Sequence, residues 1–298
     1  MLSSPLVSSQ AEIRRTFRMR VERRDALLLP GAANALTARI IEDLGFEAVY
    51  VTGAGLANTH LGMPDLGLVS VTELAETATR ISDVCRLPLV VDIDTGFGNA
   101  LNVYRTVRLL ERAGAAALQI EDQIFPKKCG HFAGKSVVPL PEMLGKIKAA
   151  LDARGDASTL VIARTDARAV DGIGQAIERA HAMTEAGADV IFVEAPESME
   201  ELRAIAKLSA PQVVNVVIGG KTPMLSIEEL RELGFAIVLY ANAALQATIH
   251  AVQEVLGHLR RTGSLAKIED RLVSFSERQR IVGKDAFDVL EARYATSE

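Results

Sequence analysis

Short apolar runs alternate with longer segments of helical periodicity along most of the chain. Eight runs of the kind that forms buried parallel strands occur at residues 27–29, 48–52, 89–93, 117–120, 160–163, 190–193, 213–217 and 236–240. Segments with apolar residues at helical spacing lie at 33–44, 72–85, 99–113, 141–153, 175–186, 199–208, 227–233 and 243–259. This alternation predicts a (β/α)8 barrel of the TIM type, in which helices surround a closed parallel sheet.

Four of the predicted helices end in a similar glycine-centred pattern. The sequence is LGF at 44–46 and 233–235, and AGA at 113–115 and 186–188. Glycine readily takes the left-handed conformation that ends a helix before the next strand. A doubly wound sheet is the competing fold, but no predicted strand is followed by a dinucleotide or P-loop glycine fingerprint. The barrel is therefore favoured.

Length and the two ends of the chain determine the predicted domain organisation. The chain has 298 residues, and a barrel of this type takes roughly 250. We assign residues 1–25 to an N-terminal leader or helix, 26–262 to the barrel and 263–298 to a helical extension. The first fifteen residues are expected to be frayed. The extension has no strand pattern and is expected to pack outside the barrel or on a neighbouring subunit.

Composition and charge argue against several classes of protein. Apolar residues make up 49% of the chain and the net charge is −5. No run approaches the about 20 apolar residues of a membrane span, and no basic stripe suits nucleic acid. The N-terminus lacks a secretory signal pattern. Cys85 and Cys129 are the only two cysteines, which is compatible with a reducing cytoplasm, so we expect a cytoplasmic protein.

Acidic residues follow two neighbouring strands where barrel enzymes place their chemistry. Asp92 and Asp94 end the third predicted strand and Glu121 ends the fourth. Residues two apart on a strand project to the same face, and hard oxygen ligands suit Mg2+ or Mn2+. A lone aspartate here would more often cap a helix or pair with a lysine. Three carboxylates on adjacent strands favour a metal site.

A long loop at residues 123–135 follows the fourth strand. Loops of this length are commonly lids or binding elements. Cys129 lies in it beside Lys127, Lys128 and His131, and such positive surroundings favour a reactive thiolate. By contrast, Cys85 lies on an aliphatic helix and is interpreted as a small buried apolar residue. Thiol redox or protease chemistry is disfavoured because neither a second nearby cysteine nor a triad partner is evident.

Two further polar elements suggest an anionic ligand. Arg164, at the end of the fifth strand, can hold a carboxylate bidentately, while Thr52 and the amides of residues 53–55 can form an anion-binding concavity. The implied ligand is a small dicarboxylate or 2-oxo acid. A structural pairing of Arg164 with Glu194 is the alternative, and it is compatible with this role.

These residues resemble the isocitrate lyase and phosphoenolpyruvate mutase superfamily over about residues 29–281. The resemblance rests on VDIDTGFGN (91–99), IEDQ (120–123), KKCGH (127–131), ARTDA (163–167) and GGKTP (219–223). It implies a barrel whose eighth helix is exchanged between subunits, a Mg2+-dependent homotetramer or dimer, and a gating loop over the substrate.

The resemblance also implies roles for individual residues. Asp92 and Asp94 match the metal-site aspartates, Glu121 a water-mediated partner of the metal, and Cys129 the acid/base of the lyases. The other implied site residues are Lys127 and His131 beside the thiol, and, for substrate binding, Tyr50, Thr52, Gly53, Ala54, Gly130, Arg164, Glu194 and Asn215.

The loop motif and three differences from related sequences indicate which branch of the superfamily this chain resembles. Mutases and phosphonopyruvate hydrolases lack KKCGH, so its presence indicates a C–C bond lyase. Methylisocitrate lyases carry arginine, glutamate and arginine where this chain has Phe132, Ile218 and Gln246. Their absence favours a smaller dicarboxylate, as in the 2,3-dimethylmalate lyases and oxaloacetate hydrolases. For the hydrolases a serine is expected where Ala241 stands.

We therefore predict a Mg2+-dependent lyase that cleaves a small 2-hydroxy dicarboxylate, similar to 2,3-dimethylmalate or methylisocitrate, by retro-aldol chemistry. The products are a 2-oxo acid and a carboxylate. The alternatives are an oxaloacetate hydrolase, a phosphonopyruvate mutase or hydrolase, which residues 240–242 and the C-terminal extension keep open, and a non-catalytic barrel that binds small acids.

Overall fold

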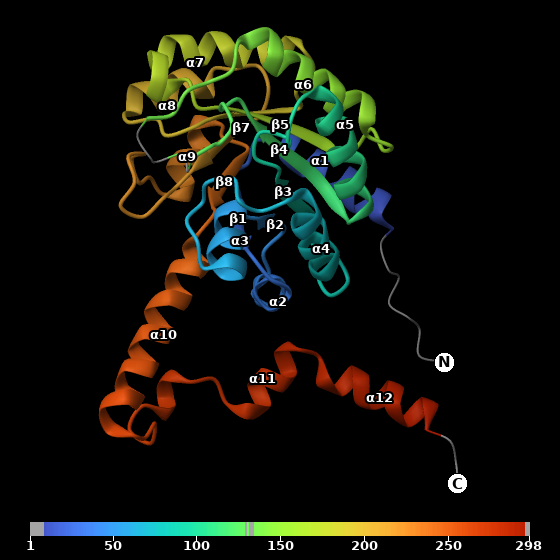
Figure 1. Cartoon of the computed structure of the whole chain (residues 1–298), viewed down its shortest axis with the longest axis vertical. Helices are drawn as coiled ribbons and strands as arrows, with labels where there is room; N and C mark the ends of the chain where they lie inside the picture. The colour runs from blue at the N-terminus through green and yellow to red at the C-terminus, as the bar shows by residue number, and fades with distance from the viewer. Residues whose placement is uncertain (1–8, 129, 131–133, 296–298) are drawn as a thin grey trace.

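The eight predicted strands close into one parallel barrel (Figure 1). The computed structural model describes residues 9–128, 130 and 134–295. The strands are β1 (Leu27–Ala32), β2 (Val49–Val51), β3 (Leu89–Asp92), β4 (Ala115–Glu121), β5 (Leu160–Thr165), β6 (Val190–Val193), β7 (Gln212–Asn215) and β8 (Ile237–Tyr240). They pair in chain order, and β8 pairs with β1. The predicted fold is confirmed.

A helix follows each strand, close to the predicted position. These helices are α2 (Ala35–Asp43), α4 (Val71–Ser82), α5 (Ala100–Arg112), α6 (Leu140–Ala153), α7 (Arg168–Glu185), α8 (Met199–Ala206), α9 (Ile227–Leu233) and α10 (Ala243–Thr262). The largest difference is in α7, which starts at Arg168 and is kinked at Gly172, where φ is 86°. No helix in the described part of the chain is long and apolar enough to cross a bilayer.

Strand residues alternate between two apolar clusters, as the pleat of a strand requires. On β2, Tyr50 belongs to the cluster inside the barrel, whereas Val49 and Val51 belong to the larger cluster between strands and helices. On β6, Phe192 lies inside and Ile191 outside. Because both faces of most strands are buried, these strands read as nearly continuous apolar runs in the sequence.

The N-terminal segment is more ordered than expected. Residues 10–15, which we predicted to be frayed, lie in helix α1 (Gln10–Glu22), which begins with a capping box between Ser9 and Glu12. Phe17 and Val21 of α1 are buried in the cluster inside the barrel. Arg14 donates a hydrogen bond of 3.0 Å to the carbonyl oxygen of Ala115 at the start of β4. Helix α1 is therefore anchored at the amino-terminal end of the barrel.

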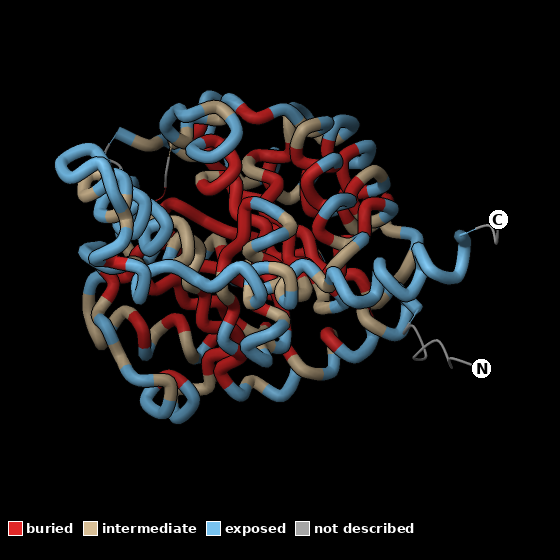
Figure 2. The backbone as a smooth tube through the Cα atoms, turned by 90° about the horizontal axis from the view of Figure 1, so that it is seen from below, coloured by how far each residue is buried: buried red, intermediate tan, exposed pale blue. Residues whose placement is uncertain are grey.

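The C-terminal segment lies outside the barrel. Helix α10 extends away from β8; α11 (Phe275–Ile281) then passes below α2 in the view of Figure 1, and α12 (Lys284–Tyr294) continues beyond it to the C-terminus. Figure 2 shows that burial is concentrated in the barrel, whereas the chain leading to the C-terminus is almost entirely exposed. Arg280 of α11 forms an ion pair with Asp43 of α2 at 2.6 Å. The extension thus contacts its own chain through α11.

Candidate active site

A cavity of about 240 Å³, lined by many charged and polar residues, lies at the carboxyl ends of the strands. Its walls combine charged residues on one side with small and apolar residues on the other. The lining residues are Tyr50, Thr52, Ala54, Asp65, Asp92, Glu121, Lys127, Lys128, Gly130, Arg164, Glu194, Asn215, Val217, Leu239, Ala241 and Asn242. Most of the predicted site residues within the described part of the chain are among them.

Asp92 and Asp94 face the same glycine, but not because both lie on a strand. Strand β3 ends at Asp92, and Asp94 follows in a left-handed conformation with φ of 47°. The amide of Asp94 donates to Asp92 Oδ1 at 3.2 Å. A Cβ atom at Gly53 would lie 3.2 Å from Asp92 Oδ2 and 3.4 Å from Asp94 Oδ1. Glycine at the start of α3 (Gly53–Leu56) therefore leaves room for both carboxylates.

Lys127 places its ammonium group among these acids. Its side chain is 3% exposed, and Nζ lies 2.7 Å from Asp94 Oδ1 and 2.5 Å from Asp65 Oδ1. Burial alone would lower the pKa of Lys127, but Asp94, Glu121, Asp92 and Asp65 raise it above its ordinary value. Burial also raises the pKa of Asp94 to about 7, against the opposing effect of Lys127. We had expected Lys127 to act beside the thiol, and its ammonium lies in the carboxylate cluster.

Glu121 turns toward the opposite wall of the cavity. Its Oε2 lies 3.3 Å from Arg164 Nε. Its Oε1 is buried and has no hydrogen-bond partner among the described residues. Burial raises the pKa of Glu121 well above its ordinary value. A buried carboxylate oxygen without a partner is suited to a water molecule or a cation.

The donor set fits a hard divalent cation, although the three predicted ligands are not gathered around one point. Asp92, Asp94 and Glu121 supply only oxygen atoms, as Mg2+ and Mn2+ prefer. Within the described ranges, no group of three His, Cys, Asp or Glu side chains is arranged to hold an ion. The acids of the cavity outnumber its bases, so additional positive charge would stabilise them. The metal site stays a prediction.

Arg164 is enclosed by carboxylates. Asp166 accepts from its Nε at 2.9 Å and from its Nη2 at 3.0 Å, and Glu194 Oε2 lies 3.4 Å from Nη1. The guanidinium carbon also lies 5.2 Å from the centre of the Phe192 ring. The expected pairing with Glu194 is therefore present, but the bidentate partner is Asp166, which sequence reasoning did not identify.

Three other predicted substrate residues are held by neighbouring side chains. Thr52 Oγ1 accepts from the Gly55 amide at 3.2 Å, capping α3, and lies 3.2 Å from Asn242 Oδ1. Asn215 Nδ2 donates to Glu194 Oε1 at 3.5 Å. Tyr50 is 3% exposed, and burial and Asp92 raise its pKa. These contacts orient polar groups toward the cavity from β2, β7 and β8.

Cys129 and His131 lie outside the described residues, as does Phe132. Gly130 between them is buried and close to the opposite wall, because a Cβ there would lie 2.5 Å from Arg164 Nη2. The side chain of Gln123 accepts from the Lys128 amide at 3.0 Å and donates to the Lys128 carbonyl at 2.8 Å. The loop is therefore fixed next to the cavity at Lys128.

The two other positions at which the sequence differs from methylisocitrate lyases lie away from the cavity lining. Ile218 is 56% exposed, and Gln246 is exposed on α10. Neither lines the cavity, whereas Val217, Leu239 and Ala241 do. In place of the charged groups expected for a methylisocitrate lyase, the wall contributed by β7 and β8 is largely apolar.

The architecture defines a class: a (β/α)8 barrel with an acidic, arginine-containing cavity at the carboxyl ends of its strands. The family profile described as phosphoenolpyruvate phosphomutase matches residues 17–260. A 2,3-dimethylmalate lyase of Eubacterium barkeri is 44% identical over 271 residues, covering 91% of this chain and 94% of that protein. A 2-methylisocitrate lyase of Aeropyrum pernix is 45% identical over 273 residues, covering 91% and 88%.

Solved structures agree with this relationship. An oxaloacetate acetylhydrolase bound to 3,3-difluorooxalacetate has a TM-score of 0.90 and 33% identity, covering 97% of this chain and 99% of that one. A phosphonopyruvate hydrolase complex with oxalate and Mg2+ has a TM-score of 0.86 and 32% identity, covering 95% and 99%. The chain belongs to the phosphoenolpyruvate mutase and isocitrate lyase superfamily.

Proposed function

We propose that this protein is a Mg2+-dependent carbon–carbon lyase that cleaves a small, alkyl-substituted 2-hydroxy dicarboxylate to a 2-oxo acid and a carboxylate. The observation that carries the proposal is the cavity lined by both Arg164 and Asp92, with the Asp94 carboxylate beside Asp92 at Gly53. A substrate with a carboxylate at one end and chelating oxygens at the other would fit such a pocket. The name of the 2,3-dimethylmalate lyase that the chain resembles denotes a substrate of this kind, and 2-methylisocitrate is a 2-hydroxy acid with one more carboxylate.

The carboxylate cluster is the proposed metal site. Asp92 and Asp94 would hold Mg2+, with Mn2+ as a substitute, and Glu121 would contact it through water. The partnerless Oε1 of Glu121 and the excess of acids in the cavity support this assignment. When bound, the ion would stabilise the negative charge that develops on the substrate oxygens.

The remaining groups divide the proton transfers between them. In the proposed cleavage, a base takes the proton of the substrate hydroxyl, the C–C bond breaks, and its electron pair forms the enolate of the departing carboxylate. The Cys129 thiol then gives its proton to the enolate carbon, with Lys127 and His131 nearby. Arg164 and Asn215 hold the substrate carboxylate, while Thr52 and the amides of Gly53 and Ala54 support the oxyanion.

The apolar wall of the cavity, opposite the charged residues, favours one class of substrate. Val217, Leu239 and Ala241 offer no charged group for a third carboxylate. This favours methyl-substituted malates over methylisocitrate. An oxaloacetate hydrolase is the second candidate, favoured by the TM-score of 0.90 to an oxaloacetate acetylhydrolase. The methyl side chain of Ala241 stands where we expected a serine for that reaction.

The proposal also includes a homo-oligomer, a dimer or a tetramer. Helix α10 projects from the barrel with Ile249, Val252 and Leu256 each 48% exposed or more. Leu28, on the outer face of β1, is 37% exposed. Exchange of α10 between two copies would cover both sets of apolar residues. A cytoplasmic setting is proposed on the low cysteine content.

A substrate panel tests the function. The purified protein would be incubated with malate, citrate and oxaloacetate derivatives, with Mg2+ or with EDTA, and assayed for pyruvate, glyoxylate and oxalate. We expect pyruvate from a methyl-substituted malate, only with Mg2+. Oxalate and acetate from oxaloacetate would indicate the hydrolase instead, and turnover of phosphonopyruvate in a 31P NMR assay would indicate P–C bond chemistry. Binding of oxalate without turnover of any compound would indicate a non-catalytic barrel.

A further inference from the structure

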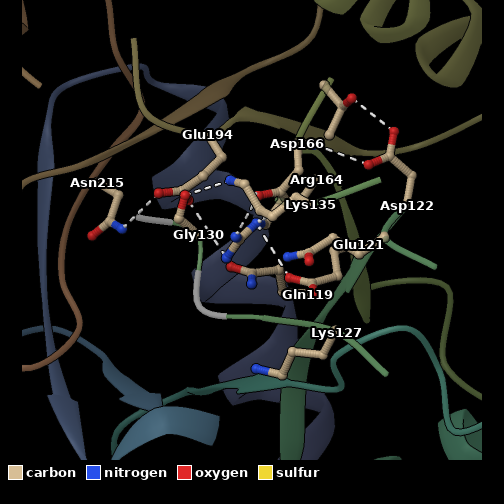
Figure 3. Close-up of polar contacts among 12 residues, drawn as sticks. Gln119, Glu121, Asp122, Lys127, Gly130, Lys135, Arg164, Asp166, Glu194 and Asn215 are labelled. Carbon is tan, nitrogen blue, oxygen red and sulfur yellow. Dashed lines mark hydrogen bonds and ion pairs between the residues drawn. The ribbon is translucent and has the colours of Figure 1, made fainter. Parts of the chain in front are cut away.

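Lys135 is a buried lysine that the proposed chemistry does not use. Its side chain is 1% exposed, and its Nζ lies 2.6 Å from Asp166 Oδ1. The same ammonium group donates to the carbonyl oxygen of Gly130. Figure 3 shows Lys135 directed toward Arg164 and Gly130. Lys135 does not line the cavity, so its charge must act through its neighbours.

Asp166 connects Lys135 with Arg164. Its side chain is fully buried, and one of its oxygens, Oδ1, lies within hydrogen-bond distance of both Lys135 Nζ and Arg164 Nη2. The amide of Asp166 donates to Asp122 Oδ1 at 2.9 Å, which fixes the backbone at the end of β5. Burial alone would raise the pKa of Asp166, but Arg164 and Lys135 hold it below its ordinary value.

Arg164 needs this compensation because three carboxylates surround it. Asp166 is hydrogen-bonded to it, while Glu121 and Glu194 lie 3.3 Å and 3.4 Å from its nitrogens. Charges this close interact strongly in a poorly solvated interior. Without the Lys135 charge, Arg164 alone would face three carboxylates, and the net negative charge around it would repel a substrate anion. Lys135 offsets the charge of Asp166, so that Arg164 can attract a carboxylate.

Lys135 also constrains the backbone that faces Arg164. A Cβ at Gly130 would lie 2.5 Å from Arg164 Nη2 and 2.7 Å from the Glu194 carboxyl carbon, so the Gly130 backbone approaches both side chains closely. The bond from Lys135 to the Gly130 carbonyl holds this backbone in place. One ammonium group therefore fixes two of the surfaces that enclose the guanidinium group.

We propose that Lys135 is a positioning residue, which through Asp166 and the Gly130 carbonyl sets the orientation and effective charge of Arg164 for binding a substrate carboxylate. The inference rests on the proposed function, in which Arg164 binds that carboxylate. It predicts that the effect of Lys135 on anion binding depends on the presence of Arg164.

A double-mutant cycle on the full-length protein tests the dependence. Oxalate affinity would be measured by calorimetry with saturating Mg2+ for the wild type, Lys135→Met, Arg164→Met and the double variant. We expect Lys135→Met to weaken oxalate binding about tenfold or more in the wild type, as loss of a charge-assisted contact does. In the Arg164→Met background the same change should have no further effect. Lys148→Met, an exposed change on α6, is the control and should bind as the wild type does.

The outcomes separate the two proposals. If Arg164→Met binds oxalate as tightly as the wild type, the carboxylate-binding role in the proposed function is wrong. If Arg164→Met weakens binding but Lys135→Met does not, or weakens it equally in both backgrounds, the role of Lys135 is overturned. Should Lys135→Met fail to fold, Lys135→Gln, which removes the charge but keeps a hydrogen-bond donor for Asp166 and the Gly130 carbonyl, replaces it with the same expectation.

Discussion

Lys127 Nζ lies 2.7 Å from Asp94 Oδ1; the Lys127 side chain is almost completely buried, and that of Asp94 is 13% exposed. Asp94 is one of the predicted metal ligands. Lys127 therefore already supplies a positive charge at the predicted metal site. Burial nevertheless leaves the pKa of Asp94 at about 7. A divalent ion bound by Asp94 would therefore have to displace a proton from part of the population near neutral pH.

The first prediction concerns the stability of the metal-free protein. Because the pKa of Asp94 rises from 3.8 to about 7 on folding, the folded state binds more protons than the unfolded state between these values. The free energy of unfolding should then decrease as the pH rises through this range. Asp94→Asn removes the titration and should reduce the decrease. Urea unfolding in EDTA at several pH values measures it; parallel curves for the two proteins would refute the assignment.

The second prediction concerns Glu121. If it supports the metal through water, Glu121→Gln should weaken Mg2+ binding by about 10- to 100-fold, as other changes around metal ligands do. The measurement is the Mg2+ concentration that gives half-maximal activity. Glu185→Gln on the exposed face of α7 is the matched control and should leave this concentration unchanged. An unchanged Mg2+ requirement in Glu121→Gln would place Glu121 outside the metal site.

Periodicity was enough to predict the barrel because all strands except β1 are almost completely buried on both faces. Where only a few residues of a charged segment are buried, the hydrophobic pattern did not reveal the packing. Phe17 and Val21 are the buried residues of α1 that enter the barrel interior, yet they stand among arginines in TFRMRVERR, so no apolar pattern in the sequence placed this helix against the barrel. The kink at Gly172 similarly concealed the first turns of α7.

The site was predictable at strand ends and unpredictable across loops. Asp92, Glu121 and Arg164 follow apolar runs, and the barrel topology alone brings them together. Asp65 and Lys135, by contrast, meet their partners only through the loops after β2 and β4. Their sequence separation from those partners carries no periodic signal, so only the folded chain identifies them.

The third prediction distinguishes the two cysteines. Burial raises the pKa of the Cys85 thiol to about 11, so it should stay protonated and unreactive at neutral pH. If Cys129 is the proton donor, iodoacetamide should modify Cys129 first and abolish turnover.

Substitution of each cysteine tests the same difference between Cys129 and Cys85. Cys129→Ser should lower kcat by roughly 100- to 10,000-fold, the usual cost of removing an acid or base, without changing oxalate binding. Cys85→Ala should retain turnover. A Cys129→Ser variant with near-normal cleavage would remove the proposed proton donor.

The last prediction concerns α10. No residue of this 20-residue helix is buried in the single chain, although its position after β8 is that of a helix that normally covers a barrel. Ile249, Val252 and Leu256 recur at helical spacing and are 48% to 56% exposed. Exposure of such a stripe is unfavourable in water, and a second copy that receives the helix against its own β1 would bury it.

Replacing Val252 and Leu256 together with glutamate should therefore dissociate the oligomer, because two charges would be buried without partners. Light scattering coupled to size exclusion would report the mass. Ala247→Glu, on the opposite side of α10, adds the same group away from this stripe and should leave the mass unchanged. If the wild type is a monomer at all concentrations, or if the double variant keeps the wild-type mass, α10 is not exchanged through these residues.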